Sequence, residues 1–181
     1  MIRSTLRGLA AVIVLLAAAT TSASGQQASD SRFGLTAGLA LPMGDFGDIA
    51  GLGFQLGGHM QMPLGTTLKL RVNADYGRYG GNDNLGIDNT TLLGAMANVV
   101  LPITTTSALK PYVYGGLGFY NWKIEGSGGG TVDGSDLAFN VGVGYDFALG
   151  GSNLFTELRF LSVQTDGNSL NSLPIVVGLR F

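Results

Sequence analysis

The sequence predicts an all-β fold, an eight-stranded antiparallel up-and-down transmembrane β-barrel. Eight segments alternate apolar and polar residues with the two-residue period of a strand. Charged residues make up 12% of the chain, about half of the ~25% found in typical soluble proteins. After the first residues, no apolar run approaches the ~20 residues that a membrane helix requires. An apolar chain without long apolar runs is typical of a barrel, because only alternate residues face lipid.

The amino-terminal residues have the layout of an export signal. Arg3 and Arg7 precede an apolar core, Leu9–Ala19, which small residues follow. We expect cleavage after Ala23 or Gly25, and the core is short for the alternative, a membrane-anchoring helix. The predicted segments are a signal peptide (residues 1–25), a short polar stub (26–31) and an outer-membrane β-barrel (32–181).

Each predicted strand has one apolar face, and the pattern is clearest in Asp136–Phe147. Leu137, Phe139 and Val141 lie on one side of this strand, whereas Asn140 and Gly142 lie on the other. All five prolines fall at predicted strand ends or starts, where no ladder hydrogen bond is lost. The predicted strands are Arg32–Leu41, Gly53–Met62, Leu68–Tyr79, Thr91–Leu101, Lys110–Lys123, Asp136–Phe147, Asn153–Val163 and Leu173–Phe181.

The last strand ends on an aromatic carboxyl terminus and has an apolar face formed by Ile175, Val177, Leu179 and Phe181. A strand cannot leave its edge unpaired in an apolar setting. We therefore expect it to close the barrel by pairing with the first strand.

The connections after odd-numbered strands are predicted to be the long ones, and together with the adjoining Asp136 they hold eight of the 12 acidic residues. With both chain ends in the periplasm, these loops would lie outside the cell. Aromatic residues are expected to gather in belts at both rims. The predicted long loops are Met43–Leu52, Gly80–Thr90, Ile124–Ser135 and Gln164–Ser172, and the predicted outer belt contains Tyr76, Tyr79, Phe119, Tyr120 and Trp122.

Alternation alone leaves open which face meets lipid, since a soluble lipocalin-like barrel has apolar residues inside. Here the polar face is rich in small residues, which fit the narrow interior of an eight-stranded barrel. Its charges nearly balance, as expected for side chains that must pair in a lumen. The predicted lumen ion network consists of Lys69, Arg71, Asp75, Asp146, Glu157, Arg159 and Arg180.

These patterns resemble the bacterial outer-membrane β-barrel domain family of small eight-stranded OmpA/OmpX-like and opacity-type barrels. The resemblance rests on Gly34–Phe46, Pro111–Gly118, Val141–Tyr145 and Val177–Phe181. It implies a Gram-negative-type cell, location in the cell outer membrane and a monomer surrounded by outer-membrane lipids. It also implies that the insertion machinery reads the last strand, with Val177, Leu179 and Phe181 as the assembly signal.

Composition disfavours several other functions. Without the leader the chain has eight basic and 12 acidic residues, a net charge of −4 that argues against nucleic acid as a partner. No cysteine is present. Asn82–Asp88 has some likeness to a calcium loop but lacks its bidentate Glu. We expect no catalytic, cofactor-binding or metal-binding residues.

We therefore expect a non-enzymatic barrel with a structural or surface-interaction role carried by acidic extracellular loops. One alternative is a narrow passive channel gated by lumen charges. A lipid-modifying enzyme would need His59, the only histidine, beside a serine and an acid. A soluble periplasmic ligand-binding barrel is the remaining alternative.

Overall fold

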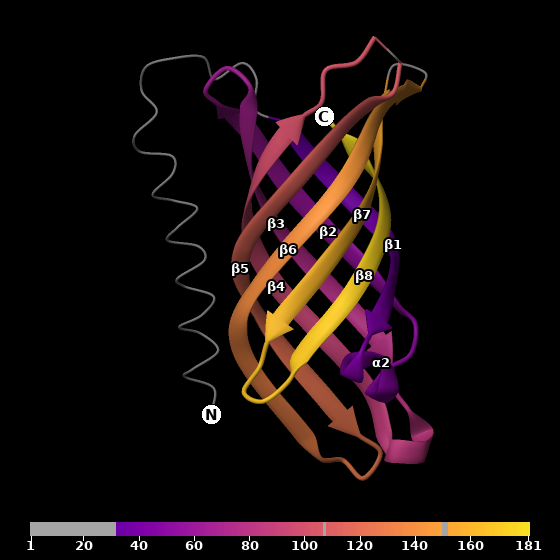
Figure 1. Cartoon of the computed structure of the whole chain (residues 1–181). Coiled ribbons are helices and arrows are strands. Elements are labelled where there is room, and N and C mark those ends of the chain that lie inside the picture. The colour runs from indigo at the N-terminus through magenta and orange to yellow at the C-terminus, as the bar shows by residue number, and fades with distance from the viewer. Residues whose placement is uncertain (1–31, 107, 150–151) are drawn as a thin grey trace. The chain divides into compact units, whose positions relative to one another are not determined.

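The computed structural model describes residues 32–106, 108–149 and 152–181, where eight strands form one closed antiparallel barrel (Figure 1). Each strand pairs with its sequence neighbours, and β1 pairs with β8. The predicted fold class is confirmed. The signal peptide and stub predicted over residues 1–31 lie outside the described residues. The elements are β1 (Arg32–Met43), α2 (Asp45–Ile49), β2 (Gly53–Leu64), β3 (Leu68–Gly80), η1 (Asp83–Leu85), β4 (Ile87–Pro102), β5 (Lys110–Gly126), β6 (Thr131–Leu149), β7 (Ser152–Gln164) and β8 (Ser169–Arg180).

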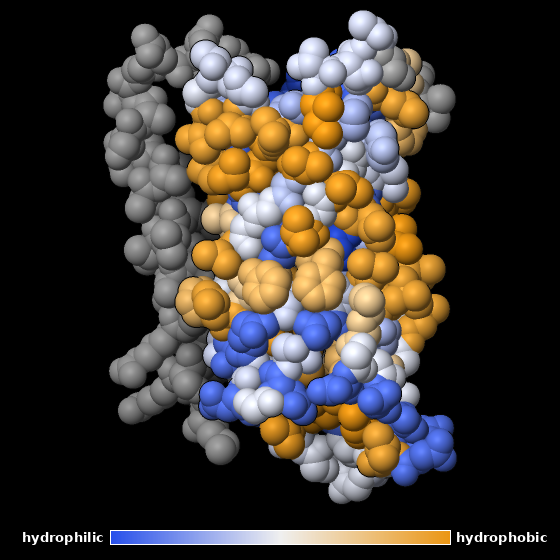
Figure 2. Space-filling view, viewed as in Figure 1, coloured by the Kyte–Doolittle hydropathy of each residue, from blue (hydrophilic) through white to orange (hydrophobic). Residues whose placement is uncertain are grey.

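The barrel has its apolar residues outside and its charged residues inside. Leu35 and Val177 are each 61% exposed on the outer wall, whereas Arg71 is 2% and Glu157 7% exposed. Alternate residues of a strand point to opposite faces, so the sequence pattern alone produces this inversion. Figure 2 shows the apolar surface over the upper and middle wall and hydrophilic residues gathered toward the lower end.

The two ends of the barrel differ, and we name them by what they carry. The terminal end is the mouth at which β1 begins and β8 finishes. The loop end carries α2 and the turns that follow β3, β5 and β7 (Figure 1). Among the described residues, no helix is long and apolar enough to cross a membrane.

The strands at the loop end are longer than the sequence pattern predicts. β5 extends to Gly126 and β6 begins at Thr131, so most of the predicted loop Ile124–Ser135 is a hairpin. The tight turn contains Gly129 with φ of 81°, a conformation that glycine adopts without strain. β4 and β8 likewise begin inside predicted loops. The prediction failed here because the outward residues of this hairpin are polar, whereas Ile124 and Val132 lie on its inward-facing side, which reverses the pattern of the barrel wall.

The segment predicted as the first long loop folds back to fill the barrel mouth. Helix α2 buries Phe46, which is 1% exposed and contacts the Tyr79 ring edge-on with ring centroids 4.9 Å apart. We call the surrounding buried cluster the apolar plug; it comprises Ala40, Phe46, Ala50, Tyr79, Leu92, Met96, Tyr120, Ala138, Leu161, Val163 and Leu170. Tyr79 and Tyr120 therefore lie in the lumen and are not part of an outer aromatic belt.

The β1–β8 seam is close-packed because small residues line it. Gly34 pairs with Arg180 and Gly38 with Val176, and the Phe181 amide donates to the Phe33 carbonyl at 2.8 Å. A Cβ added at Gly38 would lie 2.0 Å from the Ile175 carbonyl oxygen. The seam leaves no room there for a side chain.

Gly38→Ala is therefore expected to destabilise the barrel by about 1–3 kcal/mol through overpacking. The urea unfolding midpoint in detergent micelles measures this, and the mobility of unheated samples on gels reports the folded fraction. Gly58→Ala is the matched control, because a Cβ there has its nearest neighbours at 3.6 Å. Equal midpoints for the two variants would contradict the close seam.

Candidate functional site

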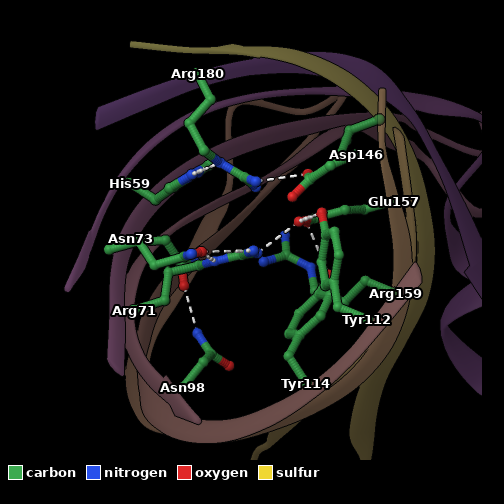
Figure 3. A network of polar contacts seen from close by, with 12 residues as sticks. His59, Arg71, Asn73, Asn98, Tyr112, Tyr114, Asp146, Glu157, Arg159 and Arg180 are labelled. Carbon is green, nitrogen blue, oxygen red and sulfur yellow. Dashed lines mark hydrogen bonds and ion pairs between the residues drawn. The ribbon is translucent and has the colours of Figure 1, made fainter. Parts of the chain in front are cut away.

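Three ion pairs cross the lumen and form its polar core. Figure 3 shows two of them, Arg71 with Glu157 and Arg180 with Asp146. Arg71 Nη1 lies 2.5 Å from Glu157 Oε1, which joins β3 to β7. Arg159 Nη1 lies 2.9 Å from Asp75 Oδ2, which joins the same two strands nearer the loop end. A third pair joins β8 to β6 at the terminal end, with Arg180 Nη1 2.5 Å from Asp146 Oδ1.

The order of residues along β3 and β7 explains the pairing. Arg71 and Asp75 point inward from β3, and Glu157 and Arg159 point inward from β7. Opposite charges therefore meet across the barrel at two successive depths. Breaking such a pair leaves an uncompensated buried charge, which costs about 3–5 kcal/mol.

Neutral side chains complete the hydrogen bonding of the buried carboxylates. Glu157 accepts from the Tyr112 hydroxyl at 2.6 Å and from the Tyr114 hydroxyl at 3.0 Å. Asp75 accepts from Gln55 Nε2 at 3.1 Å and from the Tyr120 hydroxyl at 3.0 Å. The sequence pattern predicts no role for these tyrosines in the ion network, because their cross-barrel partners are distant in the chain.

Glycines on β6 make the space that the two tyrosine rings occupy. A Cβ on Gly142 would lie 2.5 Å from the Tyr114 ring, and one on Gly144 would lie 2.4 Å from the Tyr112 ring. Both glycines are the cross-strand partners of these tyrosines. The Val-Gly-Val-Gly-Tyr pattern thus supplies an apolar outer face and a recess on the inner face.

Lys69, the remaining residue of the predicted network, takes part in none of these three pairs. It lies on β3 nearer the terminal end and lines a cavity with Gln61, Lys110 and Arg180. Six of the seven predicted residues thus form these three ion pairs, and Lys69 lines a cavity that Arg180 also lines.

His59 is a buried lumen residue. It is 7% exposed, its ring contacts the Phe155 ring edge-on at 5.3 Å, and its Nε2 accepts from Arg180 Nε at 3.4 Å. Among the described residues, no serine hydroxyl is hydrogen-bonded to His59, and no group of three His, Asp or Glu side chains could hold a metal ion.

The segment Asn82–Asp88, which has some likeness to a calcium loop, contains the short helix η1. The Asn82 side chain caps this helix by accepting a hydrogen bond from the Asn84 amide at 3.1 Å.

The residues of the predicted assembly signal point to the outside of β8. Val177, Leu179 and Phe181 are 61%, 42% and 70% exposed. They form an apolar stripe at the terminal end, and their recognition by insertion machinery stays a prediction.

An apolar outer wall around a charged, internally paired lumen defines an integral membrane β-barrel of the outer-membrane type. The chain belongs to the outer membrane protein β-barrel domain family, whose model matches residues 10–181. No curated protein sequence matches the chain significantly.

Solved structures of small barrels have the same fold. Neisserial surface protein A is 20% identical with a TM-score of 0.65, and the match covers 86% of this chain and 98% of that one. The amino-terminal barrel of Pseudomonas aeruginosa OprF is 16% identical, with a TM-score of 0.53 over 83% and 97%. The outer-membrane enzyme PagL is 15% identical, with a TM-score of 0.52 over 83% and 98%. At these identities the likeness shows the fold alone.

Glu157→Gln is expected to lower the free energy of unfolding by about 3–5 kcal/mol, because the Arg71 guanidinium is left buried without its counter-charge. Adding Arg71→Met should restore much of the loss. Urea unfolding in detergent micelles measures both variants. Lys123→Gln, which removes an exposed charge on β5, serves as the control and should change stability little. A single variant as stable as the double variant would show that the ion pair contributes nothing.

Proposed function

We propose that the protein is a non-enzymatic integral protein of the cell outer membrane that contacts other molecules through its loop end. The observation that carries this proposal is the projecting β5–β6 hairpin above a sealed lumen. The same proposal includes export through the amino-terminal signal, insertion by the outer-membrane machinery and a monomer in lipid.

The hairpin continues beyond the apolar wall. Phe119 and Leu137 are exposed apolar neighbours on its outer face, and the next outward pair toward the turn is Asn121 and Ser135, both exposed and polar. The change from apolar to polar marks the expected level of the membrane surface. The turn of the hairpin then lies well clear of the lipid.

The hairpin also presents a strand edge. β6 pairs with β7 only from Ala138 onward, so Thr131–Leu137 has no partner on that side among the described residues. Val132 on this edge is 62% exposed. A free edge with one exposed apolar side chain can accept an extended segment of another protein through main-chain hydrogen bonds.

The loop end is acidic, and this charge favours a basic partner. In the turns and polar strand ends at the loop end there are eight acidic side chains and two basic ones, Arg78 and Lys123. Side-chain hydrogen bonds from Lys123 and from Asn89 lower the pKa of the Glu125 carboxyl, so this group is ionised at neutral pH. The acids are Asp45, Asp48, Asp83, Asp88, Glu125, Asp133, Asp136 and Asp166.

The lumen favours a closed barrel over the alternative of a passive channel. Polar side chains follow the lumen from Arg180 to Asp75, but the cavity among them measures only about 20 Å³, room for about one water. Beyond Asp75 the apolar plug fills the bore. An ion would have to lose its hydration shell at both barriers.

The geometry around His59 supports a non-enzymatic role. PagL is an enzyme of the same fold, so the fold by itself permits catalysis. In this chain the single histidine faces Arg180 and Phe155 inside the lumen, away from the lipid. Among the described residues, no serine hydroxyl is hydrogen-bonded to this histidine. An acyl-transfer site needs a nucleophile within hydrogen-bonding reach of its base.

An epitope tag inserted at Gly129 should bind antibody on intact cells, because a substituent there meets no atom within 4 Å and the turn projects from the membrane. The same tag inserted after Thr104, at the terminal end, should bind only after the outer membrane is permeabilised. Fractionation of the cells should recover both proteins with the outer membrane. Equal labelling of the two tags on intact cells would contradict the orientation, and recovery in the soluble fraction would contradict the location.

The refolded wild-type protein should give no steady conductance in planar lipid bilayers, because the apolar plug blocks the bore. Glu157→Gln and Arg159→Gln should leave the recording unchanged. A steady wild-type conductance that either variant abolishes would support the channel instead.

A further inference from the structure

The β5–β6 hairpin has two different faces where it extends past β7 and β8 at the loop end (Figure 1). Its outward residues continue the row of the lipid-facing wall but are polar, whereas Ile124 and Val132 oppose each other on the inward side. Val132 is 62% exposed. The inward side of the hairpin therefore presents apolar surface to water.

Trp122 extends this apolar surface to the free edge of β6. Its cross-strand partner is Gly134, and a Cβ added at Gly134 would lie 2.7 Å from the Trp122 ring. The indole therefore lies over the edge strand, where its Nε1 donates to Asp136 Oδ2 at 2.7 Å. The ring also packs against the apolar plug. We call Trp122, Ile124 and Val132 the inner strip, which reaches from the plug to the unpaired edge of β6.

The outward side of the same edge carries an acid without an ion-pair partner. Asp133 is exposed, and its cross-strand partner is Lys123. Lys123 forms its ion pair with Glu125 on the same strand, and Asp133 forms no ion pair with any described residue. These three side chains together carry one net negative charge, so a cationic side chain placed beside Asp133 would be favoured.

A strand added at this edge would meet both faces at once. β7 pairs antiparallel with β6 from Ala138 onward, and an added strand would continue that ladder over Thr131–Leu137. Successive side chains of a strand point to opposite faces. Those beside Val132 and Gly134 would therefore lie over the inner strip, and the one beside Asp133 would point outward. The edge thus favours an extended segment with apolar side chains on one face and basic ones on the other.

A second copy of the chain does not fit this edge. Two copies in one membrane have the same orientation, so their β6 strands run in the same direction and cannot pair antiparallel as β6 and β7 do. An in-register parallel pair would set Asp133 beside Asp133, and like charges directly opposite each other destabilise a sheet. A basic segment of another protein avoids both problems.

We propose that the free edge of β6 binds an extended segment of another protein in which basic and apolar residues alternate. The apolar side chains cover the inner strip, and a basic one lies beside Asp133. This inference rests on the proposed function, because it requires the hairpin to face the outside of the cell. Main-chain hydrogen bonds to Thr131–Leu137 supply affinity, and the two faces supply specificity. Binding also removes the apolar surface of Val132 from water.

The test uses the barrel refolded in neutral detergent micelles and a fluorescent peptide, as long as the free edge, in which lysine and valine alternate. Fluorescence anisotropy, corrected with empty micelles, should show saturable binding. Amide hydrogen exchange should slow across Thr131–Leu137, because new main-chain hydrogen bonds protect these amides. A block peptide of the same composition, with its lysines at one end and its valines at the other, cannot place each kind on its own face and should bind more weakly.

Asp133→Lys should weaken binding of the alternating peptide about tenfold, because a favourable cross-strand pair of charges becomes a like-charge pair. Asp83→Lys is the matched control. It changes the net charge equally but lies on η1 between β3 and β4, on the opposite side of the hairpin from the free edge. Both side chains are exposed, so both variants are expected to fold.

Two results would show a contact by charge alone: equal weakening by Asp133→Lys and Asp83→Lys, or binding without protection of Thr131–Leu137. Either result overturns the pairing at the edge and leaves the proposed contact through the loop end in place. Equal binding of the alternating and block peptides, or no binding of either, also overturns the inference. The tag at Gly129 tests the orientation of the hairpin separately, so a failure of the proposed function is recognised by its own measurement.

Discussion

Every buried charge in this barrel must be neutralised by another group of the same lumen, because the lipid outside offers no counter-charge. Arg71 with Glu157 and Arg159 with Asp75 meet this requirement at two depths between β3 and β7. These pairs link strands that are not neighbours in the sheet, whereas the backbone ladder links only neighbours. The ion pairs thus brace the barrel across its bore.

The need to neutralise the buried charges also determines which uncharged residues surround them. Glu157 needs hydroxyl donors, the donors come from two large rings, and the rings need the recesses left by Gly142 and Gly144. The high glycine content of the chain follows in part from this packing. A lumen filled in this way leaves only about 20 Å³ free among its central charges, so stability and closure have the same cause.

The sequence predicted what depends on alternation and could not predict what depends on packing. The regular pattern of Leu137–Phe147 identifies β6 and its lipid-facing side, and the sign of the inward charges identifies Arg71, Asp75, Glu157 and Arg159 as lumen residues. Alternation does not specify which cation pairs with which acid, because pairing depends on how the strands are staggered around the barrel. The sequence pattern also could not predict the helix α2, because Asp45–Ile49 is short, Gly44 supplies no capping side chain, and only Phe46 is buried.

The position of α2 has a consequence for how the protein enters a bilayer. The helix follows β1 directly, but it packs against β8 as well as β1. It can therefore reach its final place only after the first and last strands have met. Until then α2 does not close the lumen of the partly formed barrel. Any leak of small solutes through the barrel should therefore occur before β1 and β8 pair.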